Sequence, residues 1–447
     1  MNINVKATRL VMRALRFLTV FGIALLNLSI TSSVTHAFSI NGQSAVDVVG
    51  QSTYDGQPSY LSATANNPMN VGMNGPAGVA VDTMRHLVYV TDANNNRVLV
   101  FQLNTDNSFP DFKADYVIGQ AGFNDTKANR GSSQPSANSL NNPSKLAIES
   151  VSGDVYVSDT GNNRVLVFQS VATNDPSATY VIGSPSFTDT NAAGVVSQNR
   201  MYSPSGIGFS GSGANLRIYI ADKDFNRVLV FGQIAVNGQN AIHVLGQSSF
   251  VASAASLSQS ALAGPSGLHI DANGRLFVAD TNNNRVMMWN LPVATDGQPA
   301  NLVLGQTWFY SSGEGVTNAA LSRPQDITQS ANGAIMVADS SNNRVLIWNT
   351  NITVSGQAAN IVLGQTNFTA NTKGTSATKM SLPSSLGSSG VTTLIADAQN
   401  NRVLVYTSTI SNNGQAAGLV LGQLTADNTP DFYGNAANNP QDKGMNG

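Results

Sequence analysis

Short runs of aliphatic and β-branched residues alternate with polar turns along most of the chain. The first repeat of this pattern contains four runs, PAGVAVD (76–82), HLVYVTD (86–92), RVLVF (97–101) and VIGQ (117–120). Runs of this length, separated by Gly, Asn, Asp, Ser and Pro, are typical of β-strands joined by tight turns. No segment of 12 residues beyond residue 37 combines a helical period with helix caps. The pattern therefore predicts an all-β fold built from antiparallel four-stranded units.

The second and third runs are joined by a phrase that occurs six times, first as VTDANNNRVLVF (90–101). Each copy places an Asp at the end of one run and an Arg five residues later, and successive arginines are 58 to 67 residues apart. A period of this size indicates repeated units whose faces are covered by their neighbours. Four antiparallel strands per unit, arranged around an axis, predict a β-propeller.

The repeated acid–base pairs are interpreted as structural. A catalytic group is normally present once, whereas a pair present in every unit serves the architecture. Near a surface each pair would stabilise the fold by about 0–1 kcal/mol, and by more if it were enclosed and hydrogen-bonded. The pairs are Asp92–Arg97, Asp159–Arg164, Asp222–Arg227, Asp280–Arg285, Asp339–Arg344 and Asp397–Arg402.

Six full blades are predicted, and residues 48–51 (VVGQ) add an extra outer strand. The blade cores are expected at about 76–120, 143–184, 204–247, 265–306, 324–365 and 383–423. An alternative arises because residues 48–75 align without gaps with residues 420–447. In that alternative the chain is a truncated seven-bladed ring that the N-terminal strand closes.

The first 37 residues differ from the rest of the chain. A basic lead, an apolar run at 17–30 and small residues near Ala37 have the layout of a signal peptide, which leaves residues 38–447 as the mature propeller. We therefore expect a secreted, periplasmic or cell-envelope protein that is monomeric and has no integral membrane segment after cleavage. The net charge of −2 gives no attraction for nucleic acid, and the absence of cysteine excludes disulfides.

The phrase D-x-x-x-N-R-V, with an upstream P-x-G-ϕ-x-ϕ-D, resembles the NHL repeat. The resemblance covers most of the chain after about residue 42 and implies a propeller, commonly one with six blades. Lys145, Asp326 and Ser385 depart from it by replacing the glycine after proline, and Phe225 interrupts the Asn-rich turn of the third repeat. The ϕ-L-G-Q ending of the fourth runs is a feature of this chain rather than of NHL repeats in general.

Some propellers of similar architecture are enzymes, a peptide-amidation lyase with histidine-bound zinc and gluconolactonase-like proteins with a divalent ion on the axis. His86, His243 and His269 occupy non-equivalent places in the repeats, so a common zinc site is not expected. No catalytic residue, metal ligand or cofactor is predicted. Calcium is left open, because Asn side chains and carbonyl oxygens also bind it.

One aromatic segment breaks the regularity of the connections. A phenylalanine recurs shortly after the fourth run in five of the six repeats, which indicates packing between blades, but the segment WFYSSGEG (308–315) occurs once. Three aromatic residues beside an acid are suited to a protein or glycan contact. The candidate ligand-binding residues are Trp308, Phe309, Tyr310 and Glu314.

These observations predict an exported, non-catalytic propeller scaffold that binds a protein or a glycan through the face carrying the long inter-blade connections. Binding residues concentrate on loops held by a rigid frame. The alternative is a metal-dependent lyase or lactonase-like enzyme with its site on the propeller axis.

Elemental analysis of the purified protein separates the two hypotheses. The scaffold hypothesis predicts that no zinc or calcium is held in a one-to-one ratio through exhaustive chelation and buffer exchange. One tightly held ion per chain, lost together with an enzymatic activity on chelation, would support the enzyme instead.

Overall fold

The computed structural model describes residues 76–421 and residues 70, 432 and 433, apart from gaps at 83, 107–109, 111–112, 170, 172, 390–391 and 401. All described residues belong to one structural unit, residues 40–447. The predicted signal peptide 1–37 and extra strand 48–51 lie outside the described residues. The same holds for most of the segments 48–75 and 420–447, so the number of blades in the complete chain stays a prediction.

The described residues form six antiparallel four-stranded sheets, and each sheet contains four strands in chain order. The first sheet consists of β1 (Pro76–Asp82), β2 (Leu87–Asp92), β3 (Arg97–Gln102) and β4 (Tyr116–Ile118). The second consists of β5 (Leu146–Ile148), β6 (Val155–Asp159), β7 (Arg164–Phe168) and β8 (Tyr180–Ile182). The third consists of β9 (Pro204–Ser210), β10 (Arg217–Asp222), β11 (Arg227–Phe231) and β12 (His243–Leu245).

The fourth sheet consists of β13 (Pro265–Ile270), β14 (Arg275–Asp280), β15 (Arg285–Asn290) and β16 (Leu302–Leu304). The fifth consists of β17 (Pro324–Gln329), β18 (Ile335–Asp339), β19 (Arg344–Trp348) and β20 (Ile361–Leu363). The sixth consists of β21 (Pro383–Ser389), β22 (Thr392–Asp397), β23 (Arg402–Tyr406) and β24 (Leu419–Leu421). The predicted all-β class and the predicted division into four-stranded units are confirmed.

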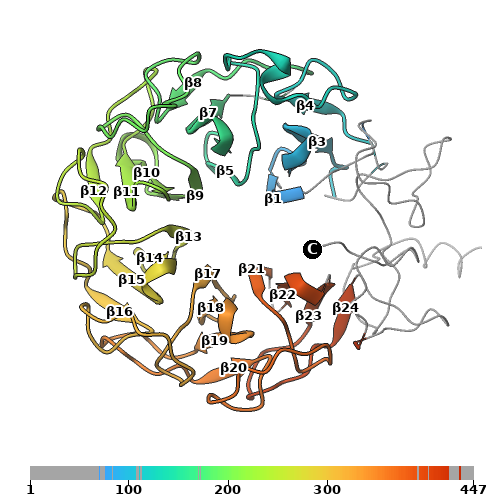
Figure 1. The fold of residues 1–447 in the computed structure, drawn as a ribbon. Helices are drawn as coiled ribbons and strands as arrows, with labels where there is room; N and C mark the ends of the chain where they lie inside the picture. Colours follow the sequence, from blue (N-terminus) through green and yellow to red (C-terminus); the bar gives the residue numbers. More distant parts are fainter. Residues whose placement is uncertain are drawn as a thin grey trace, which may run out of the picture. The chain divides into compact units, whose positions relative to one another are not determined.

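The sheets follow one another around a common centre, as the blades of a β-propeller do (Figure 1). The first strand of each sheet lies innermost, and the first strands of successive sheets contact one another. Two ends of a sheet are distinguished below. The loop end is where the second strand passes into the third and where the long connections between sheets run. The hairpin end is opposite, where the first strand turns into the second and the third into the fourth.

The core lies between neighbouring sheets. At the junction of the fourth and fifth sheets, Phe277 and Val286 of the fourth pack with Val337 and Trp348 of the fifth, all of them buried. Comparable clusters of buried residues join the other successive sheets. Each sheet is therefore stabilised by its neighbours rather than by a core of its own, which is the property expected of repeat architectures.

The turn between the third and fourth strands covers the outer edge of the preceding sheet. The Gly356 N–H donates to the Val303 carbonyl of β16 at 2.8 Å, and the Ser355 hydroxyl accepts from the Val303 N–H at 3.3 Å. An unpaired strand edge invites pairing with other chains, so this turn protects it. The same arrangement covers β4, β8, β12 and β20 through Asn174 and Asp175, Asn237 and Gly238, Asp296 and Gly297, and Asn413 and Gly414.

The glutamine after each fourth strand fastens the loop end. The Gln306 amide donates to the Asn284 carbonyl in the turn of its own sheet, at 3.0 Å, and to the Gly313 carbonyl in the following connection, at 2.8 Å. Gln120, Gln247 and Gln365 donate in the same way. Ser184 replaces glutamine in the second sheet, and its hydroxyl donates only within the connection. The ϕ-L-G-Q ending thus has a structural cause.

We predict that Gly356→Ala destabilises the protein by about 1–2 kcal/mol. Gly356 has a φ of +67°, and an added Cβ would lie 3.1 Å from the Cα of Thr307. Chemical denaturation of wild type and variant measures the difference. The control is Gly232→Ala, where an added Cβ meets nothing within 4 Å. Equal stability of Gly356→Ala and Gly232→Ala would contradict a role of the turn in edge protection.

Candidate functional site

Each of the six predicted Asp–Arg pairs forms across its own turn. The distance from Arg Nε to Asp Oδ2 is 2.6 or 2.7 Å, and both side chains are 0% exposed in every pair. In the fourth sheet the intervening residues form a short 3-10 turn, η5 (Thr281–Asn283), closed by Asn284 in the left-handed conformation. All six pairs are therefore enclosed and hydrogen-bonded, so the figure of about 0–1 kcal/mol for a surface pair does not apply to them.

In the second to sixth sheets the guanidinium also joins the two connections on either side of its sheet. Arg285 donates to the carbonyl of Phe309 in the connection that follows the fourth sheet. Its other amino group donates to the carbonyls of Ser258 and Ala261, in the connection that precedes this sheet, at 3.0 and 2.7 Å. Arg164, Arg227, Arg344 and Arg402 make equivalent sets of bonds.

The carboxylates complete this network. Asp280 accepts hydrogen bonds from the Ala263 N–H at 2.5 Å, from the Asn283 amide at 2.9 Å and from Arg285. Burial raises the pKa of the Asp280 carboxyl, and the positive charge of Arg285 and these hydrogen bonds oppose that rise. All three hydrogen bonds come from groups of the fold and the Asp280 side chain is 0% exposed, which leaves it unsuited to contact a substrate.

The third sheet departs from this pattern because Phe225 takes the place of the turn asparagine. The Phe225 ring stacks on Tyr202 at 5.5 Å between centroids and lies 5.2 Å from the Arg227 guanidinium carbon. Asp222 therefore lacks an asparagine partner, although it still accepts from the Tyr202 N–H and from Arg227. Burial raises the pKa of Asp222 to about 6, against the opposing effect of Arg227.

The predicted aromatic site divides into exposed and inward-facing residues. Trp308 and Tyr310 are 74% and 72% exposed, and Glu314 is also exposed. Phe309 is partly buried instead and packs against the cluster that joins the third and fourth sheets. Phe123, Phe187, Phe250 and Phe368 pack against the apolar clusters in the same way. Phe309 thus takes the position of the recurring phenylalanine, and only Trp308 and Tyr310 present their rings to solvent.

The segment that carries these two rings is held by side chains along its length. Beyond the bond from Arg285 to Phe309, the Asn284 amide donates to the Ser312 carbonyl at 2.9 Å and the Gln306 amide to the Gly313 carbonyl at 2.8 Å. The Asn342 amide of the fifth sheet donates to the Gly315 carbonyl at 2.7 Å. The backbone of the exposed segment is therefore fastened to both the fourth and the fifth sheet.

No other described connection carries an aromatic ring at the places of Trp308 and Tyr310. The residues equivalent to Trp308 are Gly122, Ser186, Ser249 and Asn367, and those equivalent to Tyr310 are Asn124, Thr188, Val251 and Thr369. The exposed pair is consequently a property of one connection rather than of the repeat.

The histidines lie apart in the repeat, and the described residues contain no group of three or more His, Cys, Asp or Glu placed to hold a metal ion. His86 lies in the turn before β2, and His243 is the first residue of β12, 3.2 Å from Asp296. His269 lies on β13, where burial lowers its pKa against the opposing charges of Asp271 and Asp326.

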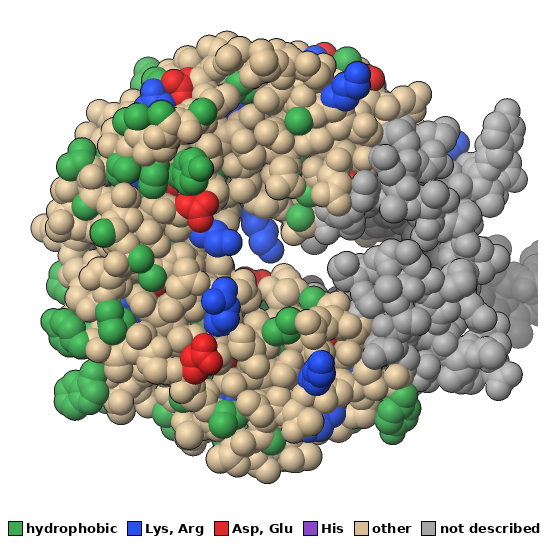
Figure 2. Space-filling view, in the orientation of Figure 1, with side chains coloured by type: hydrophobic (Ala, Val, Ile, Leu, Met, Phe, Trp, Pro, Cys, Tyr) green, Lys and Arg blue, Asp and Glu red, His purple; other side chains and the backbone are tan. Residues whose placement is uncertain are grey.

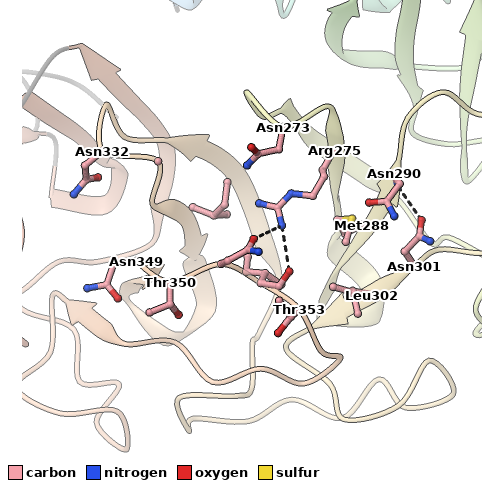
Figure 3. Close-up of a pocket in the computed structure, with 14 residues that line it drawn as sticks. Asn273, Arg275, Met288, Asn290, Asn301, Leu302, Asn332, Asn349, Thr350 and Thr353 are labelled. Atoms are coloured by element: carbon pink, nitrogen blue, oxygen red, sulfur yellow. Dashed lines mark hydrogen bonds between the residues drawn. The ribbon is translucent and has the colours of Figure 1, made fainter.

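A polar pocket of about 650 Å³ lies at the hairpin end, between the fourth and fifth sheets, and sequence reasoning missed it (Figure 3). Its walls carry mainly asparagine and threonine side chains, together with Arg275. Asparagine is common throughout this chain, so the sequence does not indicate which asparagines lie together in the folded protein. The pocket is lined by Asn273, Arg275, Met288, Asn290, Asn301, Leu302, Asn332, Gly333, Ile335, Asn349, Thr350, Asn351, Ile352 and Thr353.

The family model for the NHL repeat matches residues 73–101, 140–168 and 262–286. The chain contains NHL repeats. The matched stretches begin just before the first strand of the first, second and fourth sheets and extend into the third strand. The NHL repeat therefore corresponds here to the inner strands of a blade and to the turn that carries the Asp–Arg pair. A comparison with curated protein sequences found no match.

Solved structures of other proteins are similar to this chain at low sequence identity and with TM-scores below 0.5. Virginiamycin B lyase from Staphylococcus aureus has 14% identity and a TM-score of 0.42, over 75% of this chain and 81% of that chain. A streptogramin B lyase structure has 12% identity and a TM-score of 0.45, over 80% and 89%. Hydrazine synthase from Kuenenia stuttgartiensis has 13% identity and a TM-score of 0.45, over 76% and 79%.

We predict that Arg285→Ala destabilises the protein by about 3–5 kcal/mol, because it leaves the buried carboxylate of Asp280 without its cation. Arg285→Lys should recover little, since one ammonium group cannot reach all the acceptors of the guanidinium fork. Denaturant-induced unfolding measures both effects. The control is Arg323→Ala, whose side chain is exposed and has no hydrogen bond to another described residue, with an expected change within about 0.5 kcal/mol. A similar loss for Arg285→Ala and Arg323→Ala would contradict the structural role.

Proposed function

We propose that this NHL-repeat protein is an exported, non-catalytic scaffold that binds a protein partner through its loop end. Trp308 and Tyr310 serve as the anchors of the contact, with Glu314 at its rim. The observation that carries the proposal is the exposure of these two rings, 74% and 72%, on a segment whose carbonyls are held by Arg285, Asn284, Gln306 and Asn342.

The chemistry of the two rings supports a protein contact. Trp and Tyr are enriched among the residues that contribute most to protein–protein affinity, because each buries a large apolar area and keeps a polar group for hydrogen bonding. A segment that is already fastened loses little conformational entropy on binding, so more of the contact energy is available for affinity. Among the described residues, Trp308 and Tyr310 are the only Trp or Tyr besides Tyr433 with large exposure.

The low content of charged residues indicates that a partner would be held by short-range contacts rather than by long-range electrostatic attraction. Only 11% of the residues are charged, and the face shown in Figure 2 consists mostly of backbone and uncharged polar side chains. Charge complementarity mainly raises association rates, whereas buried aromatic anchors mainly slow dissociation. We therefore expect the complex to depend little on salt.

Export is proposed from the signal-like segment 1–37, with its basic lead, apolar run and small residues. Independently, the described residues include no helix whose length and hydropathy would let it cross a membrane.

Affinity capture with three baits tests the proposal. Wild type, the double variant Trp308→Ala/Tyr310→Ala and the control Asn367→Ala/Thr369→Ala are immobilised and exposed to the same extracellular or envelope fraction. The control changes the equivalent positions of the next connection. We expect a protein that wild type and control retain in 0.5 M salt and that the aromatic variant loses by more than tenfold, as for two anchor residues.

Unfolding midpoints of the three baits confirm that each is folded. If all three baits retained the same proteins, Trp308 and Tyr310 would not be the residues that bind the partner. Elution of wild type's partner by a soluble oligosaccharide, rather than by protein competitor, would point to a glycan ligand at these rings.

A further inference from the structure

The polar pocket between the fourth and fifth sheets is much larger than the hollow of about 50 Å³ at the equivalent place between the fifth and sixth sheets. Arg275 begins β14 and reaches across the junction, and the residue at its place in the fifth sheet is Ala334. Arg217 takes this place in the third sheet, so the arginine alone does not distinguish the junction. Asn351 follows β19, and the residues at its place in the fourth and sixth sheets are Pro292 and Thr409. A feature that architecture requires would recur, as the Asp–Arg pairs do, so this combination calls for a different explanation.

Arg275 forms part of the pocket wall and is not free to receive an anion. Its Nε donates to Asp271 at 2.7 Å, and a second nitrogen lies 2.7 Å from the same carboxylate. Its remaining amino group donates to the Asn351 side-chain oxygen at 3.1 Å and to the Ile352 carbonyl at 3.2 Å. Figure 3 marks hydrogen bonds of the Arg275 guanidinium with dashed lines. The positive charge is thus neutralised by Asp271, and the guanidinium holds the two sheets together across the pocket.

The remaining polar groups of the pocket are uncharged. Asn273, Asn290 and Asn349 are exposed, and their side-chain amides have no hydrogen bond to another described residue. Each free amide offers two donors and one acceptor. The lining contains no carboxylate and no cation other than Arg275. Such a lining favours a neutral ligand whose groups both donate and accept hydrogen bonds.

The residues at the base of the pocket and its volume further restrict the chemical class of the ligand. Met288, Ile335 and Ile352 are buried beneath the amides and supply an apolar base. The volume of about 650 Å³ lies within the range of small-molecule sites, roughly 300–1,000 Å³. A sugar ring presents hydroxyl groups at its edge and C–H groups on its face, which matches amides around an apolar base.

We propose that this pocket binds a neutral oligosaccharide of two or three sugar units. Asn273, Asn290 and Asn349 bind its hydroxyl groups, and Arg275 positions Asn351 and the fifth-sheet wall. The site lies at the hairpin end, whereas Trp308 and Tyr310 lie at the loop end, so it is independent of the proposed protein contact.

Calorimetric titration with maltotriose, cellotriose and chitotriose tests the inference, with ligand-observed saturation-transfer NMR as a second readout. We expect saturable binding of at least one of the three sugars to wild type. Asn290→Ala/Asn349→Ala should weaken it about tenfold or more, since two hydrogen-bonding side chains are lost. The matched control is Asn240→Ala, an exposed asparagine of the third sheet's hairpin with no side-chain hydrogen bond to another described residue.

Trp308→Ala/Tyr310→Ala should leave the sugar affinity unchanged, and circular dichroism verifies that all variants are folded. The absence of saturable binding for all three sugars at about 10 mM, which means a Kd weaker than roughly 10 mM, overturns the inference. Binding that survives Asn290→Ala/Asn349→Ala, or that is stronger for a sulfated or uronic-acid trisaccharide than for its neutral counterpart, overturns it as well.

Discussion

A buried guanidinium at the loop end of each sheet is the interaction on which the rest of this structure depends. Arg285 is a charged group with no access to water, and it is compensated by one carboxylate and by carbonyls from two different connections. The arginines of the second, third, fifth and sixth sheets are compensated in the same way. Burying an ion is expensive unless every donor finds a partner. The hydrogen bonds offset the desolvation of the guanidinium, and they also pair carbonyls of the long connections that would otherwise be left without a donor. Arginine is required, since only a planar fork reaches acceptors on three sides.

Amides extend this network where charge would be too costly. Asparagines in the turns and glutamines after the fourth strands bind carbonyls that the arginines do not reach, such as those of Ser312 and Gly313. This explains how a chain with only 11% charged residues and no cysteine holds its long connections where the structure describes them, without α-helices. Because an amide has donors and an acceptor, the same residue type can fasten a loop and, where it is left unpaired, bind a ligand.

The two irregular features belong to the same junction. The segment with Trp308 and Tyr310 connects the fourth and fifth sheets at the loop end, and the polar pocket lies between these sheets at the hairpin end. In a repeat protein the shared residues maintain the frame, whereas the residues that differ are free to take on function. The regular bonds around Phe309 hold the frame, and its neighbours Trp308 and Tyr310 are exposed because the frame does not use them.

Local sequence was sufficient to determine the strands, the turns and the Asp–Arg pairs. A pair separated by five residues across a tight turn is brought together by backbone geometry alone, so Asp280 and Arg285 could be matched without a structure. The departure at Phe225 could be located too, although its stacking on Tyr202, a residue from the preceding connection, could not. The tertiary structure decided three further matters. It buried the pairs completely, it turned Phe309 inward while leaving Trp308 and Tyr310 exposed, and it gathered Asn273, Asn290 and Asn349 around one pocket. Each of these depends on how neighbouring sheets pack, and burial and convergence arise from contacts between segments far apart in the chain, which a local pattern does not encode.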